Sequence, residues 1–297
     1  MKTDSTRFVL FTLVLCFVAI SCSDSPKPNG IIALLTDYGT TDSYVGTVSG
    51  AILRINPKVR LVTLTHEVPS YDIREASYLL ASAAVEFPPG TVFMAVVDPG
   101  VGSARREIAL ETRDGKYFVG PDNGIFSDVI RSCGLKRVHS IDNVLWIRKT
   151  GVSTTFHGRD IFGPAAAHLS LGSGVQKAGK PIDKLVQFTR AEARIDSLNL
   201  SGAILHRDHY GNLITNIPAE MAAKTGLKNG MELTVRVGYS FVAATFETRY
   251  SVVDSGRFVV VINSQGRLEI ARNLASAGDS LGAHAGDPLM IYTTALK

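Results

Sequence analysis

The sequence predicts an α/β protein with two structural parts, and three observations lead to this prediction. From residue 31, apolar runs typical of buried strands alternate with segments of helical spacing. After about residue 190 the helical segments end, and short strands follow, separated by Gly, Asn and Asp turns. The 297 residues are enough for two domains of ordinary size. We therefore expect a mostly parallel sheet covered by helices on both faces, followed by an all-β barrel or sandwich.

The first part is predicted from its regular alternation of strands and helices. Strands are expected at 31–39, 59–66, 91–100 and 106–112, and helices at 43–55, 73–87 and 161–171. Asp72 is expected to cap the second of these helices, and Asp122 or Asn123 a further one that starts in the segment 120–130. Arg159 and Asp160 are expected to pair and to cap the last helix.

The second part reads as a chain of short strands. Strands are expected at 200–208, 231–238, 248–253, 257–263 and 288–294. One short helix is expected near 268–276. A polar, glycine-containing stretch at 172–198 marks the boundary, so the predicted domains are 31–185 and 195–297.

The N-terminus predicts export. Lys2 and Arg7 precede an apolar run at 8–20, which is about as long as a signal-peptide core and short for a membrane-spanning helix. Ser21 directly before Cys22 resembles the lipobox of bacterial lipoproteins, in which the cysteine is lipidated. We expect a signal peptide at 1–22, a tether at 23–30 and a lipoprotein anchored on the periplasmic side. A secreted or soluble periplasmic protein is the alternative. Cys133 would then be the one cysteine left unmodified, so no internal disulfide is expected.

Composition and spacing disfavour two classes of partner. The chain is 20% charged with a net charge of +4 and has no basic run, so no nucleic-acid surface is expected. His66, Glu67, Asp98 and His157 are residue types that bind metals, but their spacing matches no metal motif. We therefore expect no catalytic metal.

Polar side chains follow the expected parallel strands where a ligand site should form. Asp37, His66 and Asp98 lie at the carboxyl ends of three of these strands, and ligands bind beyond the carboxyl ends of such strands. A turn can bring Asp98 and Arg105, seven residues apart, face to face. The segment 206–218 is either a plain hairpin or a cup of acceptors for an amine or a nucleobase edge.

Seven segments, taken in order, give the chain a family resemblance. They are TDYG, THEVPSYD, VDPGVGSARR, GPDNG, TFHGRDIFGP, DHYGNLITN and NSQGRLEIARN. In this order they resemble the S-adenosylmethionine (SAM) hydroxide adenosyltransferases, hydrolases related to enzymes that fluorinate or chlorinate the same substrate. The resemblance covers nearly everything from Ile31 to the C-terminus. It implies a Rossmann-like N-terminal domain, a C-terminal β-barrel, and a homotrimer with sites between one subunit's N-domain and a neighbour's C-domain.

The resemblance also implies a catalytic triad of Asp98, Arg105 and His157. Arg105 would favour ionisation of a water placed against it, and His157 would accept the proton. Asp98 would orient Arg105 or the histidine. Gly158 follows the histidine where the fluorinating relative has serine, which favours water over halide as the nucleophile.

The implied substrate contacts lie in both parts of the chain. They are Asp37 at the ribose hydroxyls, Tyr71 beside the reacting carbon, Gly158 next to the triad, Asp208 and Asn212 at the methionine and adenine ends, and Ser264 at the carboxylate. Gln265 stands where the fluorinating relative has arginine, which puts carboxylate recognition there in doubt.

The implied activity is hydrolysis of SAM to adenosine and methionine, with no cofactor. Two alternatives remain open. One is a lipoprotein that binds adenosine or SAM without turnover, which an export signal favours because SAM is mainly intracellular. The other is a metal-dependent hydrolase of nucleosides or phosphoesters. The membrane is expected as a partner only through the N-terminal lipid.

Overall fold

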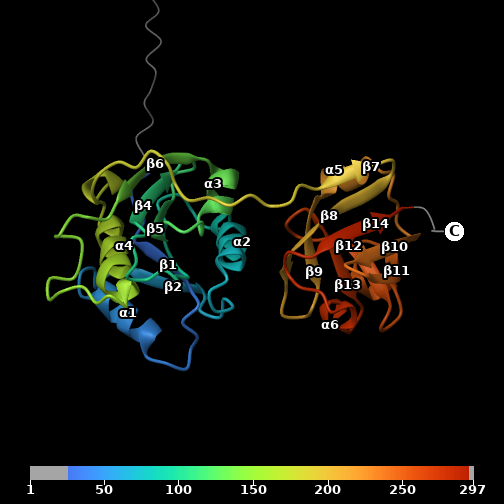
Figure 1. Cartoon of the computed structure of the whole chain (residues 1–297), viewed down its shortest axis with the longest axis horizontal. Helices are drawn as coiled ribbons and strands as arrows, with labels where there is room; N and C mark the ends of the chain where they lie inside the picture. Colours follow the sequence, from blue (N-terminus) through green and yellow to red (C-terminus); the bar gives the residue numbers. More distant parts are fainter. Residues whose placement is uncertain (1–25, 294–297) are drawn as a thin grey trace, which may run out of the picture.

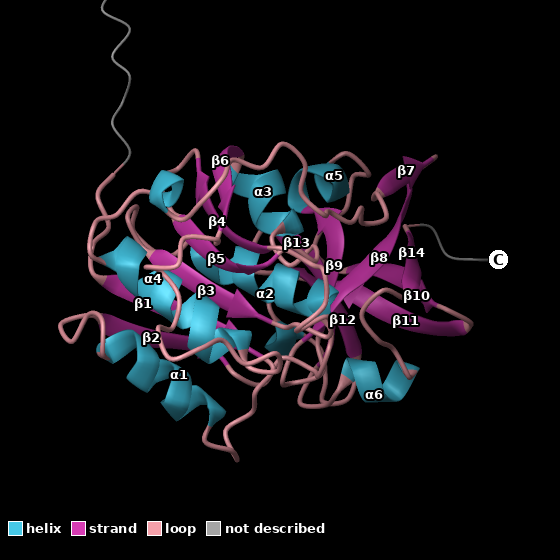
Figure 2. Cartoon of the chain, turned by 60° about the vertical axis from the view of Figure 1, so that its left-hand side comes forward, coloured by secondary structure: helices cyan, strands magenta, loops and turns pink. Residues whose placement is uncertain are grey.

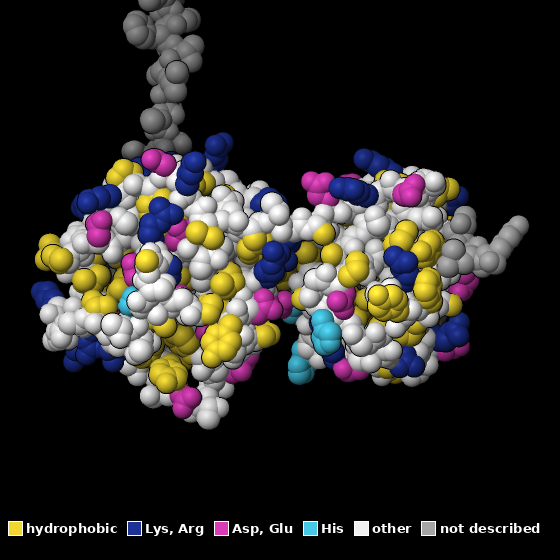
Figure 3. Space-filling view, viewed as in Figure 1, with side chains coloured by type: hydrophobic (Ala, Val, Ile, Leu, Met, Phe, Trp, Pro, Cys, Tyr) yellow, Lys and Arg dark blue, Asp and Glu magenta, His cyan; other side chains and the backbone are white. Residues whose placement is uncertain are grey.

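The computed structural model describes residues 26–293, which form two sheets, each with its own helices and core (Figure 1). The predicted signal peptide, Cys22 and the first tether residues lie outside the described residues. Within 26–293, no helix combines the length and the apolar character that crossing a bilayer requires. On the face seen in Figure 3, acidic and basic side chains are interspersed over both halves.

The N-terminal half is built on a mixed sheet of six strands in the order β2-β1-β3-β5-β4-β6. The strands are β1 (Ile31–Thr36), β2 (Arg60–Thr65), β3 (Val92–Val96), β4 (Glu107–Thr112), β5 (Tyr117–Pro121) and β6 (Leu135–Ser140). β2, β1, β3 and β5 run parallel, whereas β4 is antiparallel to both β5 and β6. The sheet is therefore mixed: it is parallel over four neighbouring strands, as predicted for most of it, and antiparallel at this edge. A tight turn at Gly115 (φ 79°) makes β4 and β5 a hairpin instead of a crossover.

Helices cover both faces of this sheet (Figure 2). They are α1 (Tyr44–Leu53) and α4 (Gly163–Ser170) on one face, and α2 (Ile73–Ala84) and α3 (Ser127–Cys133) on the other. Alternate residues of β1 serve the two cores: Ile32 and Leu34 pack under α1 and α4, and Ala33 and Leu35 under α2. The apolar run read as a buried strand is explained by this burial on both faces.

Of the predicted helix caps, one is confirmed. The Asp72 side chain accepts a hydrogen bond from the Glu75 N–H at 2.9 Å, which caps α2. Asp122 and Asn123 do not cap α3, which begins later, at Ser127. Asp122 instead forms an ion pair with Arg106, and its side chain accepts a hydrogen bond from the Val186 N–H.

The C-terminal half is a β-barrel. Its sheet runs β14-β10-β11-β12-β13-β9-β8-β7, and pairing of β14 with β8 closes it, leaving β7 outside. The strands are β7 (Arg194–Asp196), β8 (Asn199–Arg207), β9 (Leu213–Pro218), β10 (Met231–Val237), β11 (Ser240–Phe246), β12 (Phe258–Ile262), β13 (Arg267–Arg272) and β14 (Pro288–Tyr292). Two short helices, α5 (Ala219–Ala223) and α6 (Ala277–Leu281), lie at its ends.

Two sequence predictions fail in the barrel. The helix expected near 268–276 is the strand β13, because Leu268 and Ile270 face the barrel core and the backbone pairs with both β12 and β9. The strand expected at 248–253 is a short 3₁₀ turn at Tyr250–Val252.

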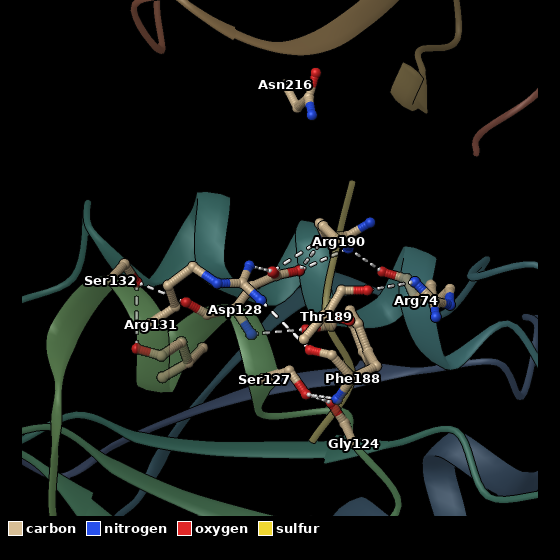
Figure 4. A network of polar contacts seen from close by, with 12 residues as sticks. Arg74, Gly124, Ser127, Asp128, Arg131, Ser132, Phe188, Thr189, Arg190 and Asn216 are labelled. Carbon is tan, nitrogen blue, oxygen red and sulfur yellow. Dashed lines mark hydrogen bonds and ion pairs between the residues drawn. The ribbon is translucent and has the colours of Figure 1, made fainter. Parts of the chain in front are cut away.

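The segment that joins the two halves is fastened to α3 and α2 (Figure 4). Arg190 pairs with Asp128 at 2.6 Å and donates to the carbonyl of Arg74 at 2.7 Å. The Phe188 N–H donates to the Ser127 hydroxyl. Burial opposes ionisation of Asp128, but the hydrogen bonds and charge of Arg190 outweigh it and lower the pKa of that carboxyl.

Helix α2 also touches the barrel directly. Tyr78 stacks on His206, with ring centroids 5.3 Å apart, and the Glu75 carboxylate contacts the His206 ring nitrogen. The Tyr78 hydroxyl donates to Gln265 Oε1 at 2.6 Å. The side chain of Gln265 is therefore engaged within its own chain.

Candidate active site

A cavity of about 360 Å³ opens at the carboxyl ends of β1 and β3, which are neighbours in the parallel part of the sheet. Its walls include Asp37 after β1, Asp98 after β3, and His157 with Gly158. This is where ligands bind in open α/β sheets, and the volume lies in the range of small-molecule pockets. The sequence-predicted residues of the N-terminal half thus come together at one place.

Asp98, Arg105 and His157 form a connected group on one wall. The Arg105 Nε donates to Asp98 Oδ1 at 2.9 Å, and Nη2 lies 2.6 Å from Asp98 Oδ2. The same Nη2 donates to His157 Nδ1 at 2.7 Å. The turn between β3 and β4 brings the aspartate and the arginine face to face, as expected. All three side chains are at most 9% exposed, so their interactions are poorly screened by water.

A fourth charged group, Glu107, completes the arrangement. Arg105 Nη1 donates to Glu107 Oε1 at 2.9 Å, and this oxygen also lies 3.1 Å from His157 Nδ1. Each of the three guanidinium nitrogens therefore has an acceptor within the protein. Arg105 is not among the residues that line the cavity, whereas Asp98 and His157 line it directly.

A close backbone contact holds the turn after Asp98 against the segment that precedes His157. A Cβ at Gly102 (φ 77°) would overlap the carbonyl oxygen of Thr154, so the turn after β3 fits only if this residue is glycine. His157 immediately precedes one turn of π-helix, Gly158–Phe162, which leads into α4. Such π-turns recur at functional sites because they shift side chains out of helical register.

Arg159 and Asp160 pair locally, as predicted, with an Nε–Oδ1 distance of 2.7 Å. They do not cap α4, which has no side-chain cap. Asp160 is fully buried and accepts from the Ser153 N–H at 2.9 Å. Asp160 therefore binds both Arg159 and the backbone at Ser153, which fixes the loop that precedes His157.

Aromatic rings form another wall. Tyr38, Tyr44 and Phe156 contact one another edge-on or tilted, with centroids 5.3 to 6.0 Å apart. Burial, followed by the charges of Asp37 and Asp98, raises the pKa of Tyr38 far above its ordinary value. Its hydroxyl is therefore a neutral hydrogen-bonding group at any physiological pH.

Asp37 and Tyr71 lie together at the cavity mouth. The Tyr71 N–H donates to Asp37 Oδ2 at 3.1 Å, and the tyrosine side chain is 71% exposed. Tyr71 has φ of 69°, in the left-handed region that residues other than glycine rarely adopt. Strain of this kind is often found at ligand sites.

The predicted residues of the C-terminal half lie elsewhere. Asp208 accepts from both the backbone N–H and the side-chain amide of Asn212, at 2.8 and 2.9 Å, inside the β8–β9 turn. Ser264 is exposed in the β12–β13 turn. Strand register separates these turns: Leu213 pairs with Ile270, near one end of β13, whereas Ser264 precedes its other end.

Polar residues bridge the space between these turns. Asn263 donates to Glu269 at 3.3 Å, and Tyr250 donates to Glu269 at 2.6 Å. Burial first, then the Glu269 hydrogen bond and charge, and last the charge of Asp208 raise the pKa of Tyr250. We call this row, Asp208–Asn212–Tyr250–Glu269–Asn263 with Ser264 beside it, the barrel cup. No residue of the barrel cup lines the cavity of its own chain, whose lining residues lie between 37 and 159.

The residues of the metal alternative do not assemble. His66 is buried between two hydroxyls, with Nδ1 2.8 Å from Thr36 Oγ1 and Nε2 3.2 Å from Thr63 Oγ1. Glu67 is exposed and accepts from Thr40. Over residues 26–293, no three His, Cys, Asp or Glu side chains converge as a metal site would require.

Sequence reasoning missed Glu107 and the tyrosines Tyr38 and Tyr44 as site residues. Tyr38 directly follows Asp37 at a strand end, which was a usable signal. The sequence pattern indicates Tyr44 only as part of a helix and Glu107 only as part of a strand. Nothing local in the sequence indicates that Glu107 contacts a histidine 50 positions later.

Comparisons with known proteins extend over both halves. Residues 32–179 match the family model for the SAM hydroxide adenosyltransferase N-terminal domain, and residues 202–290 match that for the C-terminal domain. The solved structure of an uncharacterized conserved protein from Thermotoga maritima superposes with a TM-score of 0.85 at 37% identity, covering 88% of this chain and 99% of that one.

Curated relatives match over similar lengths. The (R)-S-adenosyl-L-methionine hydrolase of Methanocaldococcus jannaschii is 34% identical, covering 88% of this chain and 95% of its own. The enzyme of the same name from Salinispora tropica is 36% identical, covering 89% and 98%. A fluorinase from an Actinoplanes species is 30% identical, covering 87% and 96%.

Proposed function

The chain belongs to the SAM hydroxide adenosyltransferase family, and we propose that it is a hydrolase that converts SAM to adenosine and methionine at the cavity beside β1 and β3. The observation that carries this proposal is the connected group of Asp98, Arg105 and His157 on the cavity wall. The group supplies a proton acceptor and fixed charges next to a space of suitable size.

The reaction needs one water and no redox partner. The water oxygen bonds to the 5′-carbon while the carbon–sulfur bond breaks, and its electron pair goes to sulfur, which becomes the neutral thioether of methionine. His157 takes the water proton at Nε2 and later releases it to solvent. Proton transfer of this kind contributes typically ~10²–10⁴-fold to the rate.

The cavity suits a cationic substrate. Asp37 and Asp98 place carboxylates on its wall, which favour a sulfonium near them. The aromatic wall of Tyr38, Tyr44 and Phe156 limits water around the reacting atoms. Since a hydroxide-like oxygen attacks a cation, charge is neutralised in the transition state, and a poorly hydrated pocket favours that change.

The substrate-binding residues of the barrel act, in this proposal, on a neighbouring copy. Asp37, Tyr71 and Gly158 would hold the ribose and the reacting carbon from the N-terminal side. Asp208, Asn212 and Ser264, in the barrel cup, would hold the methionine and adenine ends from the next subunit of a homotrimer. The absence of barrel residues from the lining of the cavity supports this arrangement.

Subunit complementation tests this interface. Asp98→Asn inactivates the cavity and Asp208→Ala inactivates the cup, so each variant alone should have little activity. Co-expressed in equal amounts, they should restore about a quarter of the sites of a symmetric oligomer, because intact halves then meet across the interface. Sites contained within single chains would regain nothing.

The activity test uses the purified protein with SAM, and chromatography detects adenosine and methionine. Each reaction is run both with and without EDTA, and His157→Ala runs beside the exposed control His284→Ala. We expect both products with the wild type and the control, and almost none with His157→Ala. Binding without products, measured by calorimetry, would make the chain a SAM-binding protein; loss of activity only in EDTA would indicate a metal-dependent hydrolase.

We propose further that the reaction uses no cofactor and that the protein is exported and anchored on the periplasmic side through lipidated Cys22. The sequence of residues 1–22 supports the anchor. A Cys22→Ser variant that leaves the membrane fraction would support lipidation, whereas unchanged fractionation would contradict it.

A further inference from the structure

We propose that Glu107 is a positioning residue that makes His157 a base toward the cavity. The proposal rests on the proposed hydrolysis and deepens it. Its starting point is that two groups of opposite kind compete for one histidine nitrogen. His157 Nδ1 lies 2.7 Å from Arg105 Nη2, which can only donate, and 3.1 Å from Glu107 Oε1, which can only accept when ionised.

The position of the imidazole proton decides which partner is used. When Arg105 donates to Nδ1, the neutral ring carries its proton on Nε2, and a water in the cavity finds a donor there instead of a base. When Nδ1–H donates to Glu107, the lone pair is on Nε2. Nε2 has no hydrogen-bond partner among residues 26–293 and is not among their buried unpaired atoms, so it is open to the cavity.

Arg105 has another acceptor available when it releases the histidine. Asp98 Oδ2 is buried and lies 2.6 Å from Nη2, yet no N–H is aligned with it for a hydrogen bond. A small rotation of the guanidinium toward this oxygen would satisfy it and free Nδ1 for Glu107. Arg105 Nη2 therefore has an acceptor in either arrangement: His157 Nδ1 in one and Asp98 Oδ2 in the other.

Glu107 also balances the charge that forms during the reaction. Once Nε2 has taken the water proton, the ring is a cation beside the Arg105 cation, and Glu107 is the carboxylate in direct contact with it. Asp98 faces it only across Arg105, Tyr38 stays neutral, and Arg159 pairs with Asp160. An acid that orients a histidine and stabilises its protonated form is familiar from hydrolase triads.

Glu107 acts from outside the cavity. It is not among the residues that line it, and its side chain, 23% exposed, approaches His157 from the side of Arg105. Its loss should therefore change turnover more than substrate binding.

The test compares Glu107→Gln with Glu111→Gln, a substitution of an ion-paired carboxylate on the same strand but away from His157. We expect Glu107→Gln to lower kcat by about 10- to 100-fold, with KM changed less than about threefold. The acid limb of its pH–rate profile should move to lower pH, because the protonated ring loses a neighbouring negative charge. Glu111→Gln should lower thermal stability and leave the acid limb in place.

Nitrogen NMR of labelled His157 gives a second readout. The wild type should populate the Nδ1–H form, and Glu107→Gln the Nε2–H form. If Glu107→Gln does not fold, Glu107→Asp carries the test and should keep the wild-type acid limb with a reduced kcat. Wild-type kcat and an unmoved acid limb in a folded Glu107→Gln protein that still hydrolyses SAM would overturn the proposal. Absence of hydrolysis in the wild type would instead remove the function on which it rests.

Discussion

Gly158 lies directly against Tyr38: a Cβ added at Gly158 would overlap the tyrosine hydroxyl oxygen and come within 3.2 Å of the ring carbon that carries it. The contact joins the loop after β1 to the residue next to His157. A larger residue at this position must therefore displace the Tyr38 ring, apart from any preference between nucleophiles.

We expect Gly158→Ser to lower kcat/KM for SAM by about 100-fold, because the displaced Tyr38 or His157 loses alignment. The double variant Gly158→Ser with Tyr38→Phe should recover part of the loss, since the overlapping oxygen is gone. Tyr38→Phe alone is the control for the lost hydroxyl. If the double variant is no better than Gly158→Ser, the packing explanation is wrong.

At position 71 the glycine variant should be more stable than the alanine variant, which is the reverse of the usual order. At φ of 69°, Tyr71→Gly should be more stable than Tyr71→Ala by about 1 kcal/mol, because only alanine meets the left-handed penalty. Both variants should raise KM for SAM equally, as both lack the ring. Urea denaturation measures the stability difference. Tyr239, fully exposed and without positive φ, is the control, and there alanine should be the more stable choice.

Stability should fall as the pH drops below about 6.5. Burial lowers the pKa of His66 and of His168, so the unfolded chain takes up protons before the folded one does. Their contribution is complete above the unfolded pKa and is lost as pH falls toward the folded one. The free energy of unfolding between pH 7.5 and 5.5 tests this. His168→Gln should reduce the slope, whereas the exposed His284→Gln should not.

The Arg190–Asp128 pair should contribute measurably to the folded state. Asp128→Asn is expected to lower the free energy of unfolding at pH 7 by about 1–3 kcal/mol, because Arg190 loses a partly buried charged acceptor. The pKa of Asp128 is lowered, so the difference should persist down to the ordinary aspartate range and close only as pH falls below it. Glu192→Gln, which breaks the exposed pair with Arg194, should have almost no effect. Equal stability of Asp128→Asn and wild type at pH 7 would contradict the prediction.

The sequence predicted best where one pattern determines the structure. The run at 31–36 is apolar throughout because β1 is buried on both faces, and Asp72 caps α2 because its side chain reaches a free N–H three residues on. Strand β13 was misread because Leu268, Glu269 and Ala271 suit helices, and pairing with β12 and β9 outweighed that preference.

The sequence predicted the site residues that lie in recognisable motifs, but not the contacts between distant segments. Asp98 and Arg105 are close in sequence, so a turn sufficed to place them together. His157 comes from a distant segment, and the approach of Glu107 to it depends on how β4 sits against the loop before α4. No pattern in the sequence predicts this contact between Glu107 and His157.

The separation of the cavity from the barrel cup has a consequence for when the protein works. In the proposed arrangement a single copy carries both halves of the site but does not combine them, so activity should vanish on dilution below the dissociation constant of the assembly. A newly synthesised chain in a cell rich in SAM would be inactive until it associated with other subunits. Destruction of the cell's own methyl donor would thus be postponed until assembly.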